Sequence, residues 1–168
     1  RDFTAGKYKF RTTLPTSIPT DLDILTTITR GVPGTSMPSF AALPRDDRWA
    51  LTRYIKTLSK KFSESTPQLI PMAPPPEATP ELLEMGRKLY VEAGCNLCHG
   101  NSGRGDGPSA TTLKDDWGHA LRPFDFASGR PLKGGTGPEA VYRALMSGYQ
   151  GTPMPGFGDA LTTEQGWT

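Results

Sequence analysis

The stretch Gly94-Cys95-Asn96-Leu97-Cys98-His99-Gly100 decides how this sequence of 168 residues is interpreted. It contains both cysteines of the chain, separated by two residues, and a histidine follows directly. Two thiols at this spacing can form thioether bonds to the vinyl groups of haem, and the next residue then lies under the iron. The motif therefore predicts covalently attached haem c, with Cys95 and Cys98 as attachment points and His99 as an iron ligand.

Three other uses of this motif remain open at this point. A thioredoxin-like redox pair would need a strand–helix–strand context, which the sequence does not show. A zinc site would need a fourth ligand, and the other histidine available is His119. A disulfide between Cys95 and Cys98 would be strained. Haem is the interpretation that these comparisons favour.

The chain also contains one pattern twice. Gly31-x-x-Gly34-Thr35-x-Met37-Pro38-x-Phe40 matches Gly148-x-x-Gly151-Thr152-x-Met154-Pro155-x-Phe157 at a constant offset of 117 residues. Apolar residues at helical spacing precede the pattern in each copy, namely Ile24 with Ile28 and Val141 with Leu145. A repeat of this kind predicts two copies of one structural unit.

The repeat supplies candidates for the second axial position of haem iron. A methionine thioether opposite histidine is the pairing that raises the reduction potential. Prolines restrict the backbone on both sides of Met154. We therefore predict Met154 as the second ligand of the haem at His99, and Met37 as the axial ligand of a second haem attached upstream. The other methionines are expected to pack as ordinary apolar side chains: Met72, Met85 and Met146.

Composition and spacing divide the chain into three parts. Residues 1–62 are predicted to be the C-terminal part of a first domain, whose own attachment motif precedes the sequence. Residues 63–79 contain five prolines and are predicted to form either a semi-rigid spacer or a loop packed on one domain. Residues 80–168 are predicted to be a second domain that lacks its C-terminal helix. We thus expect the sequence to be cut at both ends.

Capping signals predict four helices and no strand. A helix is expected after Thr79, where proline occupies the first helical position, and another between Pro138 and Gly148. Thr20 with an acid three residues later starts a third helix, and Asp46 starts a fourth. The predicted apolar faces of the second and fourth are Val141, Ala144 and Leu145, and Leu51, Tyr54, Ile55 and Leu58. The fold class is therefore all-α with long loops around haem.

Composition excludes several classes of function. The formal net charge is +2, and no basic stripe of the kind that binds nucleic acid is present. No apolar run approaches the ~18 residues of a membrane span. With 19 glycines, 17 prolines and 35% hydrophobic residues, the chain can bury only a thin core, which a haem would complete.

Taken together, these motifs resemble class I c-type cytochromes, specifically tandem members of the mono- and di-haem cytochrome c family. The matching segments are the attachment motif, Gly103-x-Gly105-x-Gly107-Pro108, Gly151-Thr152-x-Met154-Pro155 and Trp49-Ala50-Leu51-x-x-Tyr54-Ile55-x-x-Leu58. The resemblance implies two cytochrome c-like domains, in each of which an N-terminal and a C-terminal helix cross. Gly86 and Tyr90 match the crossing positions of the N-terminal helix in the second domain.

The resemblance implies single-electron transfer between redox protein partners in a bacterial periplasm, soluble or tethered to the membrane. An iron with both axial sites filled leaves no position for substrate, so we expect an electron carrier and no enzyme. An alternative is a non-catalytic haem subunit or arm of a larger membrane or periplasmic oxidoreductase complex. A peroxidase with an open iron is a further alternative.

Four charged or titratable side chains are candidates for additional contacts with haem. His119 is a weaker candidate for iron ligand than Met154 and is expected at the surface or near a haem propionate. The candidates for propionate contacts are Arg104, Lys114 and Arg122.

Overall fold

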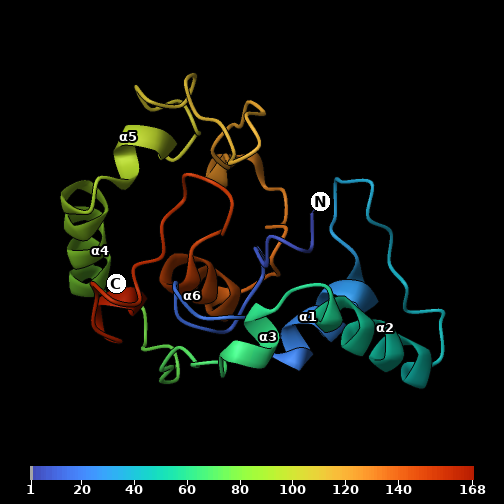
Figure 1. Ribbon diagram of the computed structural model, residues 1–168. Helices are drawn as coiled ribbons and strands as arrows, with labels where there is room; N and C mark the ends of the chain where they lie inside the picture. The colour runs from blue at the N-terminus through green and yellow to red at the C-terminus, as the bar shows by residue number, and fades with distance from the viewer. Residues whose placement is uncertain (1) are drawn as a thin grey trace.

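The computed structural model describes residues 2–168 as six α-helices and two short 3-10 helices joined by long loops (Figure 1). The helices are α1 (Asp21–Arg30), α2 (Arg45–Thr57), α3 (Lys61–Glu64), α4 (Pro80–Glu92), α5 (Cys95–His99), η1 (Phe126–Ser128), α6 (Pro138–Ser147) and η2 (Gln165–Trp167). Extended pairing within the described residues is limited to two isolated bridges, Thr13 with Leu69 and Lys114 with Ala120. The predicted all-α class is confirmed.

The helices form two groups with α6 between them. In Figure 1, α1 and α2 lie together on one side of the molecule, and α4 and α5 lie on the opposite side. Helix α1 packs on α2, α4 packs on α5 and η2, and α6 packs on η2. None of the helices within residues 2–168 combines the length and the apolar character that a membrane span requires.

The helix starts lie where the capping signals predicted them. At α1, the Thr20 hydroxyl accepts from Asp23 N at 3.1 Å, and the Asp23 carboxylate accepts from Thr20 N at 2.8 Å. This reciprocal pair is a capping box, which satisfies two backbone donors of the first turn. At α4, the Thr79 hydroxyl accepts from Leu82 N at 3.2 Å, and Pro80 is the first helical residue.

The main core cluster draws on segments far apart in the sequence. Tyr142 and Met146 of α6 are 1% and 2% exposed, and Ile70 packs with them. The Tyr142 hydroxyl donates to Pro71 O at 2.7 Å, and its ring stacks on Trp167 with centroids 4.4 Å apart. Leu14 and Leu161 cover this cluster. Of the three methionines expected to pack as apolar side chains, Met146 is buried as predicted, whereas the prediction is wrong for Met72 and Met85, which are exposed.

Two predicted helix faces are wrong in part. On α6 the buried residues are Ala140, Tyr142, Met146 and Ser147, while Val141 is 49% exposed. On α2, Leu51 and Tyr54 are exposed and Thr52 is fully buried.

Helix α2 packs through a polar stripe. Arg48 donates to the Thr29 hydroxyl at 2.6 Å, and Lys56 donates to Asp21 at 2.6 Å. Arg48, Thr52 and Lys56 lie four residues apart, so they share one helix face. The two charged residues of this face donate hydrogen bonds to side chains of α1. The spacing of apolar residues did not predict this buried face of α2, because its contacts are polar.

The Pro-rich segment has a packed part and an exposed part. Leu14 N donates to Gln68 O at 2.9 Å, and Ile70 N donates to Thr12 O at 3.0 Å. These bonds hold residues 68–70 against the N-terminal segment. The sequence was compatible with either a packed loop or a spacer. Residues 68–70 are packed, whereas residues 71–80 are exposed.

The packing of Ile70 gives a direct test of the shared core. We expect Ile70→Ala to lower the free energy of unfolding by about 3 kcal/mol, because it removes buried methyl groups and leaves a cavity beside Tyr142. Leu69→Ala is the matched control, since Leu69 is its neighbour and is 64% exposed, and should change the value by less than about 0.5 kcal/mol. Chemical denaturation of both variants measures the difference; equal effects would contradict this packing.

Candidate functional site

Helix α5 presents the three residues of the attachment motif on a single turn. Gly94 starts this turn with a φ of +73°, a left-handed conformation that lets the chain change direction between α4 and α5. The side chains of Cys95 and Cys98 are partly buried. Burial raises the pKa of the Cys95 thiol. His99 is the last residue of the turn and is also partly buried.

The His99 ring is fixed by a backbone carbonyl. Its Nδ1 lies 3.2 Å from Phe124 O, and a carbonyl oxygen can only accept a hydrogen bond. The proton is therefore on Nδ1, and the lone pair of Nε2 is free to bind a metal. The ring also stacks on Phe126 with centroids 4.8 Å apart. Sequence reasoning missed Phe124, because its contribution is a main-chain atom with no side-chain signature.

The glycine-rich loop after α5 folds back on the carbonyl ends of this turn. Gly105 N donates to His99 O at 2.8 Å, and Gly107 N donates to Cys98 O at 3.1 Å. A Cβ at Gly107 would overlap backbone carbonyl oxygens of α5, so the approach requires glycine. The Tyr90 hydroxyl donates to Gly100 O at 2.7 Å and ties α4 to the same loop. The loop thus satisfies carbonyls that a one-turn helix leaves without partners.

Met154 lies on a tight loop that follows α6. Tyr149 N donates to Met154 O at 3.1 Å and closes the loop. The Thr152 hydroxyl donates to Tyr149 O at 2.7 Å and accepts from Met154 N at 3.3 Å. Met154 is partly buried, while the prolines on either side are exposed. The backbone at this methionine is therefore fixed by three hydrogen bonds.

The loop around Met37 is built in the same way. Val32 N donates to Met37 O at 3.0 Å, and the Thr35 hydroxyl donates to Val32 O at 2.7 Å and lies 3.2 Å from Met37 N. Gly31 and Gly148 end the preceding helices with φ values of +65° and +63°. The sequence repeat is therefore a repeat of structure, down to individual hydrogen bonds.

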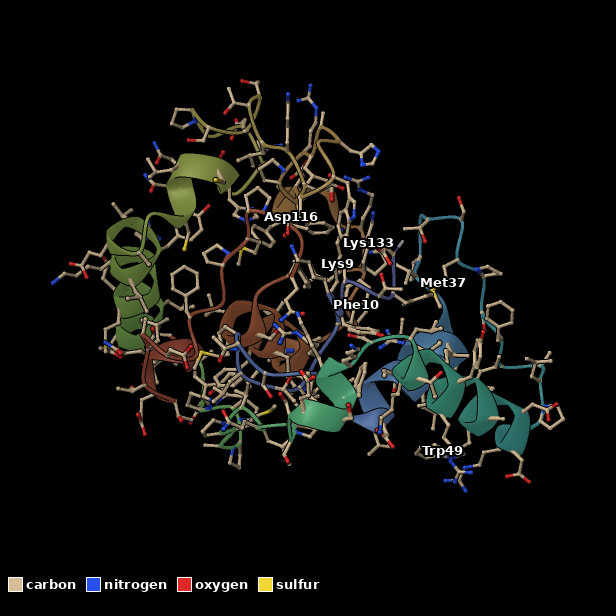
Figure 2. All side chains as sticks on the ribbon, viewed as in Figure 1. Lys9, Phe10, Met37, Trp49, Asp116 and Lys133 are labelled. Carbon is tan, nitrogen blue, oxygen red and sulfur yellow. The ribbon has the colours of Figure 1, made fainter. Side chains whose placement is uncertain are left out.

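The predicted residues fall into two places. Cys95, Cys98 and His99 share α5, and the Met154 loop is tied to the segment that follows them, since Asp116 N donates to Gly151 O at 3.2 Å. Met37 lies on the loop after α1, on the other side of the molecule from α5 (Figure 2). The structure does not bring Met37 to this attachment motif.

The donor set fits haem c. Two thiols on one helical turn, an imidazole with a free Nε2 and a partly buried thioether are the groups that this cofactor requires. Within residues 2–168, no group of three or more His, Cys, Asp and Glu side chains is arranged to hold a metal ion. His119 is exposed and lies 3.4 Å from the Asp115 carboxylate. The other side chains considered as haem contacts are exposed as well: Arg104, Lys114 and Arg122.

A family model described as Cytochrome c matches residues 83–168, about half of the chain. This chain belongs to the cytochrome c family. Membership implies covalently bound haem c and a role in electron transfer, as the attachment motif predicted. The matched region of this cytochrome contains α5 and the Met154 loop.

Among solved structures, the cytochrome is similar to a chain of the Kuenenia stuttgartiensis reducing HAO-like protein complex Kustc0457/Kustc0458. The TM-score is 0.91 and the sequence identity is 41%, over 99% of this chain and 76% of that chain. No curated protein matches the sequence. The structural similarity therefore includes the first repeat, which lies outside the family match.

The glycines that end α1 and α6 can be tested by substitution. A Cβ at Gly148 would lie 2.5 Å from the Pro155 carbonyl carbon, so Gly148→Ala adds a steric clash to the cost of a left-handed backbone. We expect a loss of about 3–4 kcal/mol in the free energy of unfolding. Gly129→Ala is the control, because Gly129 has a φ of +68° and no atom within 4 Å, and it should lose about 1–2 kcal/mol. Denaturation followed by far-UV circular dichroism compares the two, and equal losses would show that the close contact is unimportant.

Proposed function

We propose that this cytochrome transfers single electrons through haem c attached at Cys95 and Cys98, with His99 and Met154 as axial ligands. The observation that carries the proposal is the hydrogen bond between His99 Nδ1 and Phe124 O, 3.2 Å long. It directs Nε2 toward a ligand and increases the basicity of the imidazole. When bound, haem c supplies a one-electron Fe(III)/Fe(II) couple.

The side chains have separate roles in this function. Cys95 and Cys98 hold the cofactor, and His99 binds the iron from α5. The Met154 thioether would be the second iron ligand, and a thioether ligand favours the reduced state, which would raise the reduction potential. With both axial positions occupied by the protein, no position is left for substrate, and the protein acts as a carrier.

A second haem is part of the proposal. The loop around Met37 reproduces the Met154 loop in its hydrogen bonds, which supports Met37 as an axial ligand of a haem attached to a preceding segment. On this proposal, residues 1–62 belong to a first cytochrome c-like domain, residues 63–79 link the two, and residues 80–168 belong to the second.

The cellular setting follows from the chemistry and from the structural neighbour. Haem c is attached outside the cytoplasm, so we place the protein in the periplasm. The similar structure belongs to a protein complex, which supports a role as a haem subunit or arm of a larger oxidoreductase, with other redox proteins as donor and acceptor. Co-purification of a stable partner with the native protein favours this role over that of a free carrier.

Axial ligation by Met154 is tested in a Met37→His background, so that one methionine ligand at most remains. Methionine-ligated ferric haem has a weak charge-transfer band in the red. We expect Met154→Ala to abolish this band and to lower the potential by on the order of 0.1 V, because axial ligands set haem potentials over about 0.8 V. Met85→Ala, at an exposed position on α4, is the control and should retain the band. A band that persists in Met154→Ala would contradict the assignment.

The second haem is tested by a pyridine haemochrome assay on the full-length protein. We expect two haems c per chain, because Met37 requires its own attached cofactor. Met37→His should then change the ligand signature of one haem and leave the other as it was. One haem per chain would contradict the role proposed for Met37.

A further inference from the structure

We propose that residues 7–15 of the first repeat position the axial loop of the second repeat, residues 147–158, and so hold Met154 against its iron. Residues 7–15 form the clamp segment, and residues 147–158 form the axial loop. The inference rests on the proposed role of Met154 as a ligand. It assigns positioning residues that lie outside both the attachment motif and the methionine loop.

Arg11 holds the start of the axial loop. Its side chain is 4% exposed, and Nη2 donates to Ser147 O, the last residue of α6, at 2.8 Å. Nη1 donates to Ser17 O at 2.6 Å and to Leu14 O at 3.0 Å. Burial lowers the pKa of the guanidinium to about 10, so it remains charged at neutral pH. A positive charge on the carbonyl end of a helix is favourable, and it joins α6 to the clamp segment.

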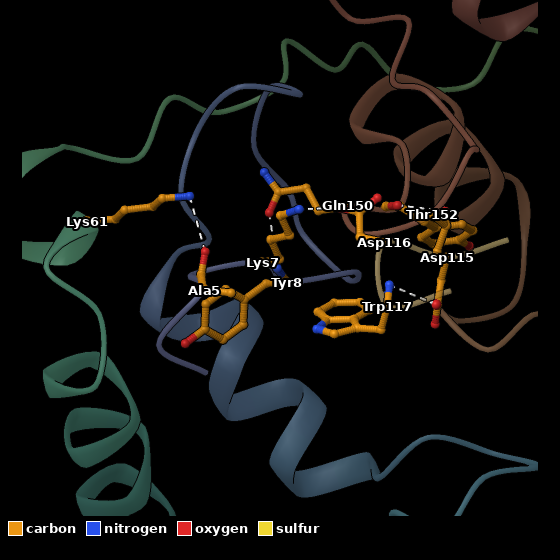
Figure 3. A network of polar contacts seen from close by, with 10 residues as sticks. Ala5, Lys7, Tyr8, Lys61, Asp115, Asp116, Trp117, Gln150 and Thr152 are labelled. Atoms are coloured by element: carbon orange, nitrogen blue, oxygen red, sulfur yellow. Dashed lines mark hydrogen bonds and ion pairs between the residues drawn. The ribbon is translucent and has the colours of Figure 1, made fainter. Parts of the chain in front are cut away.

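The middle of the axial loop is held by an amide and by a pair of rings. Tyr8 N donates to Gln150 Oε1 at 3.0 Å, and Gln150 Nε2 donates to Pro15 O at 3.2 Å. Figure 3 shows the Gln150 side chain reaching the backbone of Tyr8. The Phe10 and Tyr149 rings meet edge to face, with centroids 5.8 Å apart. Since Tyr149 N closes the loop on Met154 O, the Phe10 ring restrains the residue that fixes the methionine backbone.

An ion pair adds a second, indirect connection between the clamp segment and the axial loop. Lys7 pairs with Asp116 (Figure 3), and both side chains are partly exposed. Asp116 N in turn donates to Gly151 O at 3.2 Å. The clamp segment therefore reaches the axial loop both directly and through the segment that carries Asp116.

The far side of the axial loop also packs on the clamp segment. A Cβ at Gly156 would lie 2.5 Å from Pro15 Cγ, and one at Gly158 would lie 3.2 Å from Leu14 Cδ2. Contacts from residues 7–15 therefore lie before and after Met154. A loop held at both ends has fewer conformations in which the thioether leaves the iron.

Within residues 2–168, the equivalent loop of the first repeat is more exposed. Gly34 is exposed, and a Cβ there would meet no described atom within 4 Å, whereas its counterpart Gly151 is buried. Residues 33–36 are all exposed. Two loops with the same internal hydrogen bonds thus differ in their exposure within residues 2–168.

Displacement of Met154 by imidazole measures the restraint. In the Met37→His background, the red charge-transfer band reports Met154 alone, and its loss gives the imidazole concentration for half displacement. We expect Phe10→Ala to lower this concentration about fivefold, because it removes the aromatic contact with Tyr149. Lys7→Met should lower it about twofold, as expected for a partly exposed ion pair.

Two controls and a rescue distinguish positioning from a general loss of stability. Tyr54→Ala removes an aromatic ring that is 63% exposed on α2, away from the clamp segment, and Lys88→Met removes an ion pair within α4; both should match the unsubstituted protein. Lys7→Asp should weaken the restraint, and Lys7→Asp combined with Asp116→Lys should restore it. If Phe10→Ala does not fold, Phe10→Leu and the Lys7 variants carry the test.

The outcomes separate this inference from the proposed function. Without the band in the Met37→His protein, the ligand assignment and the inference fail together. A band that is present, with Phe10 and Lys7 variants that require as much imidazole as the two controls, overturns the inference alone. Lower imidazole concentrations in those variants, with unchanged controls and recovery in the charge-swapped pair, support it.

Discussion

The buried guanidinium of Arg11 is the constraint on which the rest of the structure depends. A buried charge is costly unless hydrogen bonds compensate for the lost water. Both Nη atoms of Arg11 have carbonyl acceptors, whereas its buried Nε has no partner among the described residues. Here the acceptors come from both repeats, because Ser17 and Leu14 precede α1 and Ser147 ends α6. If the repeats separated, the guanidinium would lose the Ser147 carbonyl oxygen as an acceptor and keep only those of its own repeat. The two halves are therefore held in one arrangement, and the distance between their methionine loops is fixed with it.

The shared core follows from the same arrangement. The N-terminal segment that carries Arg11 also places Leu14 against the cluster of Tyr142 and Met146, and its backbone pairs with the strand-like stretch that contains Ile70. A chain rich in glycine and proline buries few apolar side chains of its own. Sharing Leu14 and Ile70 between repeats enlarges the core that supports α6, and α6 in turn supports the loop of Met154.

Much of the site could be predicted from local sequence. The attachment motif, the capping box at Thr20 and the glycine ends of α1 and α6 each act within a few residues, so their spacing encodes their geometry. Burial was predicted for Met72, Met85 and Met146 alike, but only Met146 is buried, because local sequence does not show what packs against each side chain. The faces of α2 and α6 could not be predicted, because burial depends on what packs there, and α2 meets α1 through the polar stripe of Arg48, Thr52 and Lys56.

The sequence by itself predicted which residues would hold haem c and determined that two loops of one design carry the methionines, because thiol spacing and loop hydrogen bonds are local. The tertiary structure alone decided that Phe124 O orients His99, since a carbonyl leaves no trace in side-chain chemistry. It also decided, within residues 2–168, that residues 7–15 pack on the Met154 loop while residues 33–36 of the other loop are exposed. Arg11 and Ser147 are 136 residues apart, and no local pattern specifies a contact of that range.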